Sequence, residues 1–463
     1  MRFSAHFDSF HAGGRHLIFC RLLAVLLTSA VGAACLLAAS TEGMVLYVCD
    51  SSADRVVALS DRDGSGSVEM DVLGEIRVFY DDSSAGPDLS TPSHLASGED
   101  GNVYLLDGGT LDAVLVLADK NGDGDANDAG EVSTFYDASA GGLALSTPNA
   151  LVPAPDGAFY VSDDGSKGHR VLWLKDIDGD GEALDLDESR VVYDASAFSS
   201  PLLEDIEALA VTPEGHLYAG EATLQSIFLL KDVDGDGGFF TEGEAVPYFQ
   251  GSLDLPVGDV EALLVVDGVL YSCDKTAGLI LRLEDKNGDG DAADEEESSV
   301  FLDGTASVGS ITDLCALPGG GFLVLDNSKD AVLTVQDLNA DGDALDEGEA
   351  VRWLVDDGTT FATPSGLVLL PRGEDPPPQD EFLRGDATGD GFLDLSDPVR
   401  TLGYLFLGTV VTECHDAMDA DDSGDISISD AIFSLHHLFL GGAPPPPPFP
   451  LPGIDPTPDE IDC

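Results

Sequence analysis

The chain has 463 residues, and its hydrophobic residues make up 43%, enough to bury a sizeable core. Its 87 acidic residues outnumber the 20 lysines and arginines and give a net charge of −67. This charge repels phosphates and anionic membrane surfaces, so nucleic acid is excluded as an expected partner, and it opposes compaction unless the carboxylates hold cations.

The N-terminal 40 residues have the layout of a secretory signal peptide. Arg15 and Arg21 precede an uncharged stretch, residues 22–40, that is rich in Leu, Ala and Val and ends in small residues. We therefore predict a secreted, extracellular protein, with association to the cell surface as an option. The alternative is a retained membrane anchor, because the stretch is about as long as a bilayer-spanning helix.

An acidic segment recurs six times along the next part of the chain. Its first residues follow one another at intervals of 52 to 58 residues: Asp61, Asp119, Asp176, Asp232, Asp285 and Asp337. Each copy lies between two apolar runs typical of strands, and two further runs precede it. In the second copy these four runs start near residues 94, 101, 113 and 132. A four-stranded unit repeated at this period indicates a β-propeller blade.

The two ends of the repeat predict a closed ring. The first unit, from Met44, begins at its second strand, and residues 366–370 add one strand after the sixth unit. That last strand would complete the first blade and leave no exposed sheet edge. We predict an all-β six-bladed propeller over 44–371. With this period, strand count and second-strand pattern (Asp-Gly-x-x-Tyr-Val-x-Asp), it resembles the NHL and gluconolactonase-like propellers.

An acidic residue also ends the second strand of every unit, at positions Asp50, Asp107, Asp163, Glu221, Asp274 and Asp326. These residues could form a carboxylate ring around a binding surface. Alternatively, each caps a turn, as Asp side chains commonly do. We favour the cap, because all six units share the feature and a binding site needs asymmetry.

The recurring acidic loops have the spacing of calcium ligands. Oxygens at positions 1, 3 and 5, a glycine at 6 and a later acidic residue supply the oxygen-rich shell that Ca²⁺ prefers. The predicted ligands are Asp119, Asn121, Asp123, Asp125, Asp128 and Glu131; Asp176, Asp178, Asp180, Asp185 and Glu188; Asp232, Asp234 and Asp236; Asp285, Asn287, Asp289, Asp291, Asp294 and Glu297; and Asp337, Asn339, Asp341, Asp343, Asp346 and Glu349.

Two features distinguish these loops from EF-hands. The closing Glu falls at position 13 and not 12, and strands flank the loop in place of helices, so we describe the loops as EF-hand-like. The first copy (Asp61, Asp63, Ser65) and the fourth are expected to have lost some oxygens and to bind weakly.

A Pro-rich linker at 372–381 separates the propeller from a small module at 382–442, and a Pro-rich tail follows at 443–463. The module contains two 12-residue loops, each running into an amphipathic helix that ends at Gly408 or Gly441. The predicted calcium ligands are Asp386, Thr388, Asp390, Asp394 and Asp397 in one loop, and Asp419, Asp421, Ser423, Ser427 and Asp430 in the other.

These paired loop–helix units resemble a type I dockerin. The resemblance implies a module that folds around calcium and binds a cohesin. Leu395-Ser396 and Ile428-Ser429 stand where the recognition residues would lie, so we do not expect an orthodox cellulosomal cohesin. A cohesin-like or cell-surface protein is the expected partner.

A second candidate site lies at the starts of the innermost strands. Asn149, Glu207 and Glu261 stand there, with His94 and Asp313 close by in their own units. They could hold a metal that polarises a lactone carbonyl or activates water, as the gluconolactonase resemblance implies. The alternative, which we favour, is that they line the channel and hold water, so we assign no catalytic residue.

Five cysteines follow the predicted signal peptide. In an oxidising compartment we expect Cys414 to pair with Cys463 and Cys273 with Cys315, which leaves Cys49 unpaired. The sequence thus predicts a secreted calcium-binding propeller that acts as a binding or scaffolding module. The alternative is a metal-dependent hydrolase of the gluconolactonase-like kind.

Overall fold

The computed structural model describes residues 41, 43–70, 72, 74–81, 86–137, 143–165, 168–197, 203–304, 308–355, 360–372, 382–389, 391–408 and 414–449. The predicted signal peptide and nearly all of the predicted linker lie outside these residues. The chain divides into two units, of which the propeller unit ends at Arg372. Within the described part of the chain, no helix has the length and apolar character needed to cross a membrane.

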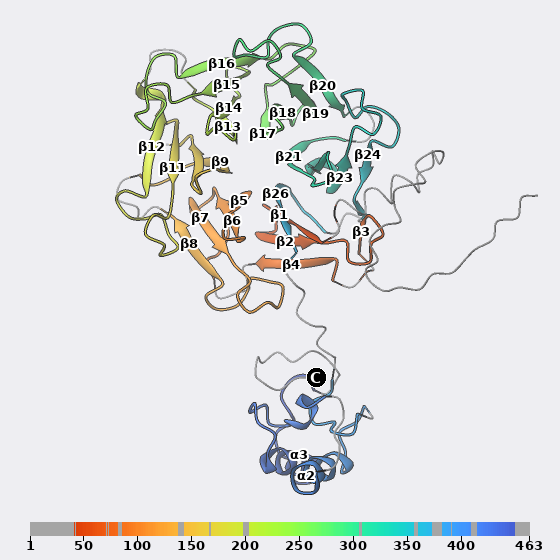
Figure 1. Ribbon diagram of the computed structural model, residues 1–463. Coiled ribbons are helices and arrows are strands. Elements are labelled where there is room, and N and C mark those ends of the chain that lie inside the picture. Colours follow the sequence, from red (N-terminus) through yellow and green to blue (C-terminus); the bar gives the residue numbers. More distant parts are fainter. Residues whose placement is uncertain are drawn as a thin grey trace, which may run out of the picture. The chain divides into compact units, whose positions relative to one another are not determined.

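The first unit is a ring of six four-stranded antiparallel sheets around a central channel (Figure 1). From the innermost strand outward, the first three blades are β26 (Pro364–Pro371), β1 (Met44–Asp50), β2 (Arg55–Leu59) and β4 (Ile76–Asp81); β5 (Pro92–Ser97), β6 (Val103–Asp107), β7 (Ala113–Leu117) and β8 (Val132–Tyr136); and β9 (Pro148–Pro153), β10 (Phe159–Asp163), β11 (Arg170–Leu174) and β12 (Ser189–Asp194).

The other three blades are β13 (Ile206–Val211), β14 (Leu217–Glu221), β15 (Ser226–Leu230) and β16 (Ala245–Gln250); β17 (Val260–Val266), β18 (Val269–Asp274), β19 (Leu279–Leu283) and β20 (Ser298–Asp303); and β21 (Ile311–Ala316), β22 (Phe322–Asp326), β23 (Ala331–Val335) and β24 (Ala350–Arg352). Two short strands, β3 (Val68–Glu69) and β25 (Leu354–Val355), pair in parallel outside the blades. Short 3-10 helices follow β12 (Ala195–Ala197) and β22 (Asn327–Lys329).

The core of the propeller lies between neighbouring blades. The middle strands β6 and β7 are buried at every position, because each of their faces packs on an adjacent blade. This explains their continuous apolar sequences, whereas the outer strands retain exposed positions. The buried residues form six clusters, and each cluster joins two consecutive blades.

The ring closes as the sequence predicts. Strand β26 pairs with β1 in antiparallel register, with Leu46 opposite Leu369 and Val48 opposite Leu367. The first blade is therefore built from both ends of the propeller sequence, and the edge that β1 would otherwise expose is hydrogen-bonded.

The C-terminal unit contains two helices, α2 (Ser396–Leu407) and α3 (Ile428–Leu440), and a 3-10 turn at Asp416–Met418. Both helices end at a left-handed glycine, Gly408 and Gly441, as predicted. Part of the predicted tail packs on this unit, since the carbonyls of Pro447 and Pro448 accept hydrogen bonds from the buried Arg384.

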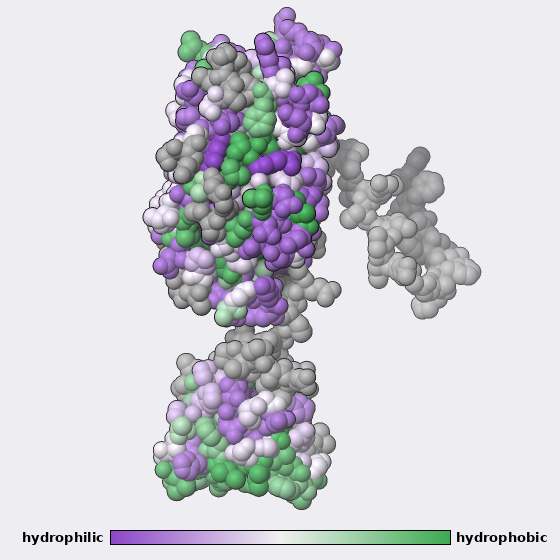
Figure 2. All heavy atoms as spheres, turned by 90° about the vertical axis from the view of Figure 1, so that its left-hand side faces the viewer, coloured by the Kyte–Doolittle hydropathy of each residue, from purple (hydrophilic) through white to green (hydrophobic). Residues whose placement is uncertain are grey.

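The helices expose much of their apolar surface. Val399, Phe406, Ile432 and Phe439 are 57% to 67% exposed, and Figure 2 shows hydrophobic residues gathered on this unit. The fully buried helix positions are short or polar: Asp397, Pro398 and Thr401 in α2, and Asp430, Ala431 and Ser434 in α3. The unit therefore buries little apolar area of its own.

The predicted Cys273–Cys315 disulfide is wrong, since both thiols are free. Cys273 packs in the cluster between the fifth and sixth blades, while Cys315 packs against the cluster between the sixth and first. The two side chains thus lie on opposite sides of one blade. Cys49 is free, as predicted, and Cys414 is disulfide-bonded. Its predicted partner, Cys463, lies outside the described residues.

Candidate metal-binding loops and channel mouth

The first aspartate of each propeller loop shapes the turn. In the third loop, Asp176 Oδ1 accepts the N–H of Gly179 at 2.6 Å, and its Oδ2 accepts that of Gly181 at 2.9 Å. Asp232, Asp285 and Asp337 repeat the pattern on the corresponding N–H groups. Glycine is required at position 6 because the backbone there has positive φ, 92° at Gly181.

The closing glutamate of each loop is buried and ties the two ends of the loop together. Glu188 Oε1 accepts the N–H of Ile177 at 2.8 Å, and its Oε2 accepts that of Asp185 at 3.2 Å. The same two-sided contact is made by all six closing residues, which are at most 4% exposed: Glu75, Glu131, Glu188, Glu244, Glu297 and Glu349.

Sequence reasoning missed two of these residues, Glu75 and Glu244. Glu244 stands at position 13 counted from Asp232, so the common spacing was sufficient to find it. Glu75 comes two residues later in its longer loop, which hides it from that count. The first and fourth loops therefore keep the closing carboxylate that they were expected to lack.

In four propeller loops, three carboxylates bring oxygens within 4.8 Å of one another. These groups are Asp61, Asp63 and Glu75; Asp176, Asp178 and Glu188; Asp232, Asp234 and Glu244; and Asp289, Asp291 and Glu297. Two oxygens bound to one Ca²⁺ at about 2.3–2.6 Å lie no farther apart than about 5 Å. The spacing of these carboxylates therefore fits one calcium ion in each loop.

Asparagine replaces aspartate at position 3 in three loops. Asn287 Nδ2 donates to Asp289 at 3.0 Å and to Asp294 at 2.7 Å, and Asn339 makes the same bridge to Asp341 and Asp346. In the loop that begins at Asp119, Asn121 Nδ2 donates to Asp123 at 2.9 Å. The asparagine lowers the loop's negative charge while keeping an amide oxygen as a possible ligand.

The concentrated charge affects how the loops titrate. In the third loop, reduced solvation and then the carboxylate of Asp180 raise the pKa of Asp178, and the same causes raise the pKa of Glu182. A bound cation would offset this repulsion, which is the physical reason for placing one there.

The loops of the C-terminal unit repeat the arrangement. Asp419, Asp421 and Asp430 bring oxygens within 4.8 Å of one another, and burial raises the pKa of Asp430 to about 7. In the first loop, Thr388 donates to both Asp386 and Asp397. Ser427 caps α3 by accepting the N–H of Ser429. The predicted ligand Asp390 lies outside the described residues.

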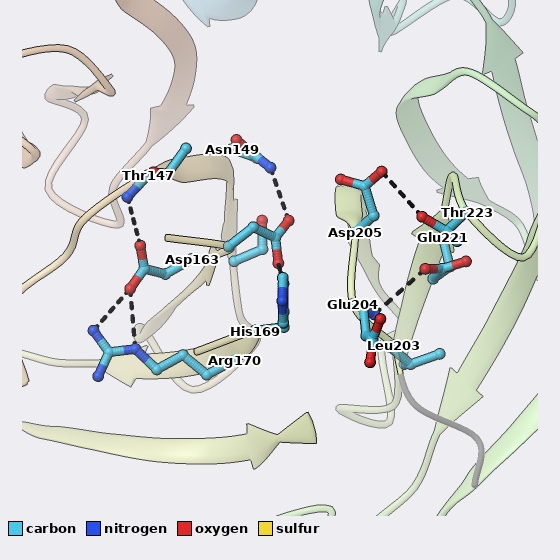
Figure 3. Close-up of polar contacts among 12 residues, drawn as sticks. Thr147, Asn149, Asp163, His169, Arg170, Leu203, Glu204, Asp205, Glu221 and Thr223 are labelled. Atoms are coloured by element: carbon cyan, nitrogen blue, oxygen red, sulfur yellow. Dashed lines mark hydrogen bonds and ion pairs between the residues drawn. The ribbon is translucent and has the colours of Figure 1, made fainter. Parts of the chain in front are cut away.

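The carboxylates that end the second strands are turn caps, as predicted. Asp163 Oδ1 accepts the N–H groups of Ser146 and Thr147 at 2.9 and 2.8 Å, and Arg170 donates to its other oxygen (Figure 3). All six are at most 3% exposed. Each uses its oxygens on the turn before the first strand of its own blade, so they offer no carboxylate ring to a ligand.

The second candidate site lies at the mouth of the central channel. Asn149, Glu207 and Glu261 each occupy a bulge in the innermost strand of its blade, at the same position in β9, β13 and β17. The bulge residues of the other blades are Ser93, Thr312 and Ser365. His94 and Asp313 are one residue farther along their strands. The acidic and amide bulge residues are thus confined to three consecutive blades.

The three bulge side chains differ in their partners. Asn149 donates to Asp164 at 2.9 Å, and Asp164 also contacts His169 at 3.3 Å (Figure 3). Glu261 forms an ion pair with Lys275. Glu207 Oε2 is buried and has no hydrogen-bond partner. Burial, and then the carboxylates of Asp205 and Glu261, raise the pKa of Glu207 to about 7.

Behind the mouth, the channel forms a cavity of about 300 Å³ with largely aliphatic walls. His94, Glu261 and Asp313 are its charged or titratable lining residues. Burial lowers the pKa of His94 to about 4 and raises that of Asp313 to about 7, so the imidazole is neutral near pH 7. This chemistry suits a polar channel that holds water or a small ligand.

Replacing Glu207 with glutamine should remove a pH-dependent loss of stability. The pKa of Glu207 is raised from its ordinary 4.5 to about 7, so the folded chain holds more protons than the unfolded chain between these values. Stability therefore falls as the pH rises through this window. We expect E207Q to melt at a higher temperature than the wild type at pH 8 and at the same temperature at pH 4, with calcium saturating. E214Q, at an exposed turn, is the control, and an equal gain at both pH values would contradict this explanation.

No protein-family model matches the sequence, and no curated protein matches it. Among solved structures, a chain of the nidogen/laminin complex is 14% identical with a TM-score of 0.47, and the match covers 71% of this chain and 99% of that one. Virginiamycin B lyase from Staphylococcus aureus is 12% identical with a TM-score of 0.41, covering 67% and 80%. A gluconolactonase from Xanthomonas campestris is 16% identical with a TM-score of 0.39, covering 60% and 78%. These values are too low to carry a conclusion about activity or partners.

Proposed function

We propose that this protein is an exported, calcium-binding β-propeller that works as a binding or scaffolding module and is tethered to a partner by its dockerin-like C-terminal unit. The observation that carries the proposal is the recurrence of one carboxylate arrangement in successive blades. Four propeller loops bring three carboxylates within 4.8 Å, and a loop of the C-terminal unit does the same.

The donor set favours calcium over other common cations. The candidate ligands are carboxylate, amide and hydroxyl oxygens, which suit hard cations, and the loops contain no Cys or His as zinc sites usually do. The loops are also numerous enough to offset part of the −67 net charge. Export supplies the setting, since extracellular calcium is high enough to fill weak sites.

The tether is proposed from the paired loop–helix units. Their exposed side chains repeat at an interval of 33 residues, so Val399 corresponds to Ile432 and Phe406 to Phe439. Exposed apolar residues of this kind are typical of a protein-binding surface. We propose a cohesin-like or cell-surface protein as the partner.

Calorimetric titration of metal-free protein with CaCl₂ tests the calcium assignment. We expect several equivalents to bind, up to the number of loops, and Mg²⁺ to bind more weakly because it demands a more rigid octahedral shell. Replacing Asp178 and Asp180 together with Asn should remove one equivalent, whereas D187N, at an exposed position of the same loop outside the predicted ligands, should remove none. Absence of calcium binding by the wild type would refute the proposal.

A metal-dependent hydrolase is the second candidate, and the placement of Asn149, Glu207 and Glu261 on three consecutive blades is the observation that favours it. We expect no lactonase or phosphatase activity above background in the wild type. A panel of lactones and phosphate esters, assayed with added Ca²⁺, Mg²⁺ or Zn²⁺, measures this. Turnover that disappears in E207A but persists in E214A would replace the binding-module proposal with the enzyme.

A further inference from the structure

Each acidic loop reaches beyond its own blade at position 8. In the fifth loop, the N–H of Ala292 donates to the carbonyl of Tyr248 on β16, the outer strand of the preceding blade, at 2.9 Å. The same bond recurs at 2.7 to 2.8 Å in the other five loops, from Val68 to Trp353, Ala126 to Phe79, Ala183 to Phe135, Phe239 to Val192 and Ala344 to Phe301.

The accepting carbonyls are made available by bulges. Phe79, Phe135, Val192, Tyr248 and Phe301 are each skipped in the pairing between the two outer strands of their blades. Trp353 lies in the break between β24 and β25. A bulge leaves a backbone group without a ladder partner, and here the next blade's loop supplies the partner.

The position-8 side chains are inserted into the preceding blade's core. All six are at most 3% exposed, and each belongs to the same buried cluster as the residue that accepts its N–H. Positions 1, 3 and 13, which carry the clustered carboxylates, lie on either side of position 8 along the chain. The loop's shape and its contact with the neighbouring blade are therefore linked.

We propose that each loop is a cation-dependent clamp between its own blade and the preceding one. This inference rests on the proposed calcium binding. A bound cation holds the two ends of the loop together and so presents position 8 to the bulge, while carboxylate repulsion in the metal-free loop opposes that shape. By linkage, docking and cation binding each strengthen the other by the same factor.

The clamp matters most where the ring closes. The first loop docks Val68 on Trp353 of the sixth blade and extends this contact into the parallel pair β3–β25. Together with the pairing of β26 and β1, it joins the two ends of the propeller sequence. Of the eight blade strands at this junction, β26 is thus secured by the sheet ladder, and the outer edge of the sixth blade is secured by the loop.

Trp353 provides a local measurement, because it is 1% exposed and the chain has only one other tryptophan, Trp173. In a W173F background at a temperature well below melting, we expect chelation with EDTA to shift the Trp353 emission to longer wavelength and CaCl₂ to restore it. In saturating calcium, D63A in the first loop should show this shift. D178A, the matched position of the third loop, should not show it.

A second pair of variants tests the same clamp without touching a ligand. Ala292 is fully buried against the fourth blade, whereas Ala293 beside it is exposed. A292L should displace the loop and lower the affinity of one calcium equivalent by tenfold or more, while A293L should leave all equivalents unchanged.

The outcomes separate the two proposals. If the wild type binds no calcium, both the calcium assignment and the clamp are refuted. If it binds calcium but A292L keeps every equivalent at wild-type affinity, or if D63A and D178A change the Trp353 emission equally, the calcium assignment stands and the clamp is wrong.

Discussion

Chelation with EDTA should lower the melting temperature of the propeller substantially. A ligand that binds only the folded state stabilises it by RT ln(1 + [L]/Kd), which is about 2.7 kcal/mol for one site at a hundredfold excess over Kd. Several loops contribute, and metal removal also leaves clustered carboxylates unneutralised, as in the group formed by Asp176, Asp178 and Glu188. Scanning calorimetry of the same protein in CaCl₂ and in EDTA measures the shift.

Two controls make this result specific. Adding excess CaCl₂ to the chelated sample should restore the original melting temperature, whereas raising the NaCl concentration alone should recover only part of it by screening. A melting curve that is the same in EDTA and in CaCl₂ would show that the loops are solvated acidic turns.

The ring was predictable because its signal is repeated. One acidic loop of ambiguous meaning returns near every 55 residues, as the intervals of 52 to 58 show, and each return brings the same four apolar runs. The closure of the first blade by β26 followed from an unpaired strand at each end of the repeat, and the register of Leu46 opposite Leu369 confirms it. The role of Asp163 and its counterparts as turn caps followed from the same regularity.

What escaped prediction depends on three-dimensional placement. The Cys273–Cys315 pairing failed because the sequence does not say which side of a blade a side chain faces. The bulges at Glu207 and Tyr248 are single unpaired residues in otherwise regular strands, and no residue type marks them. Glu75 was missed because a two-residue insertion breaks the spacing that identifies the closing glutamate elsewhere. Each of these features follows from packing between blades, to which the periodicity of one strand is blind.

The C-terminal unit differs in how much it depends on a cation. Its helices expose Val399, Phe406, Ile432 and Phe439, so the hydrophobic contribution to its stability is small. Arg384 is fully buried and donates to the carbonyl of Asp419, which connects the second loop to the start of the unit. A small unit with so little apolar burial needs disulfides or metal ions to fold, and Cys414 contributes one disulfide.

We therefore expect the double variant D386A/D419A to unfold the C-terminal unit and leave the propeller intact. Each substitution removes the first ligand of a loop and also the acceptor of the N–H groups that shape it, such as Gly391 on Asp386 and Gly424 on Asp419. Calorimetry in CaCl₂ should show two transitions in the wild type and only that of the propeller in the variant. The helical circular dichroism of α2 and α3 should be lost.

D425A is the matched control, because the exposed side chain of Asp425 lies in the second loop but outside the predicted ligands. It should retain both transitions. If D386A/D419A instead lowers the melting temperature of the propeller as much as that of the C-terminal unit, the two units do not fold independently. If the helical signal survives in the double variant, cation binding does not hold this unit together, and its stability must come from the disulfide and the packing around Arg384.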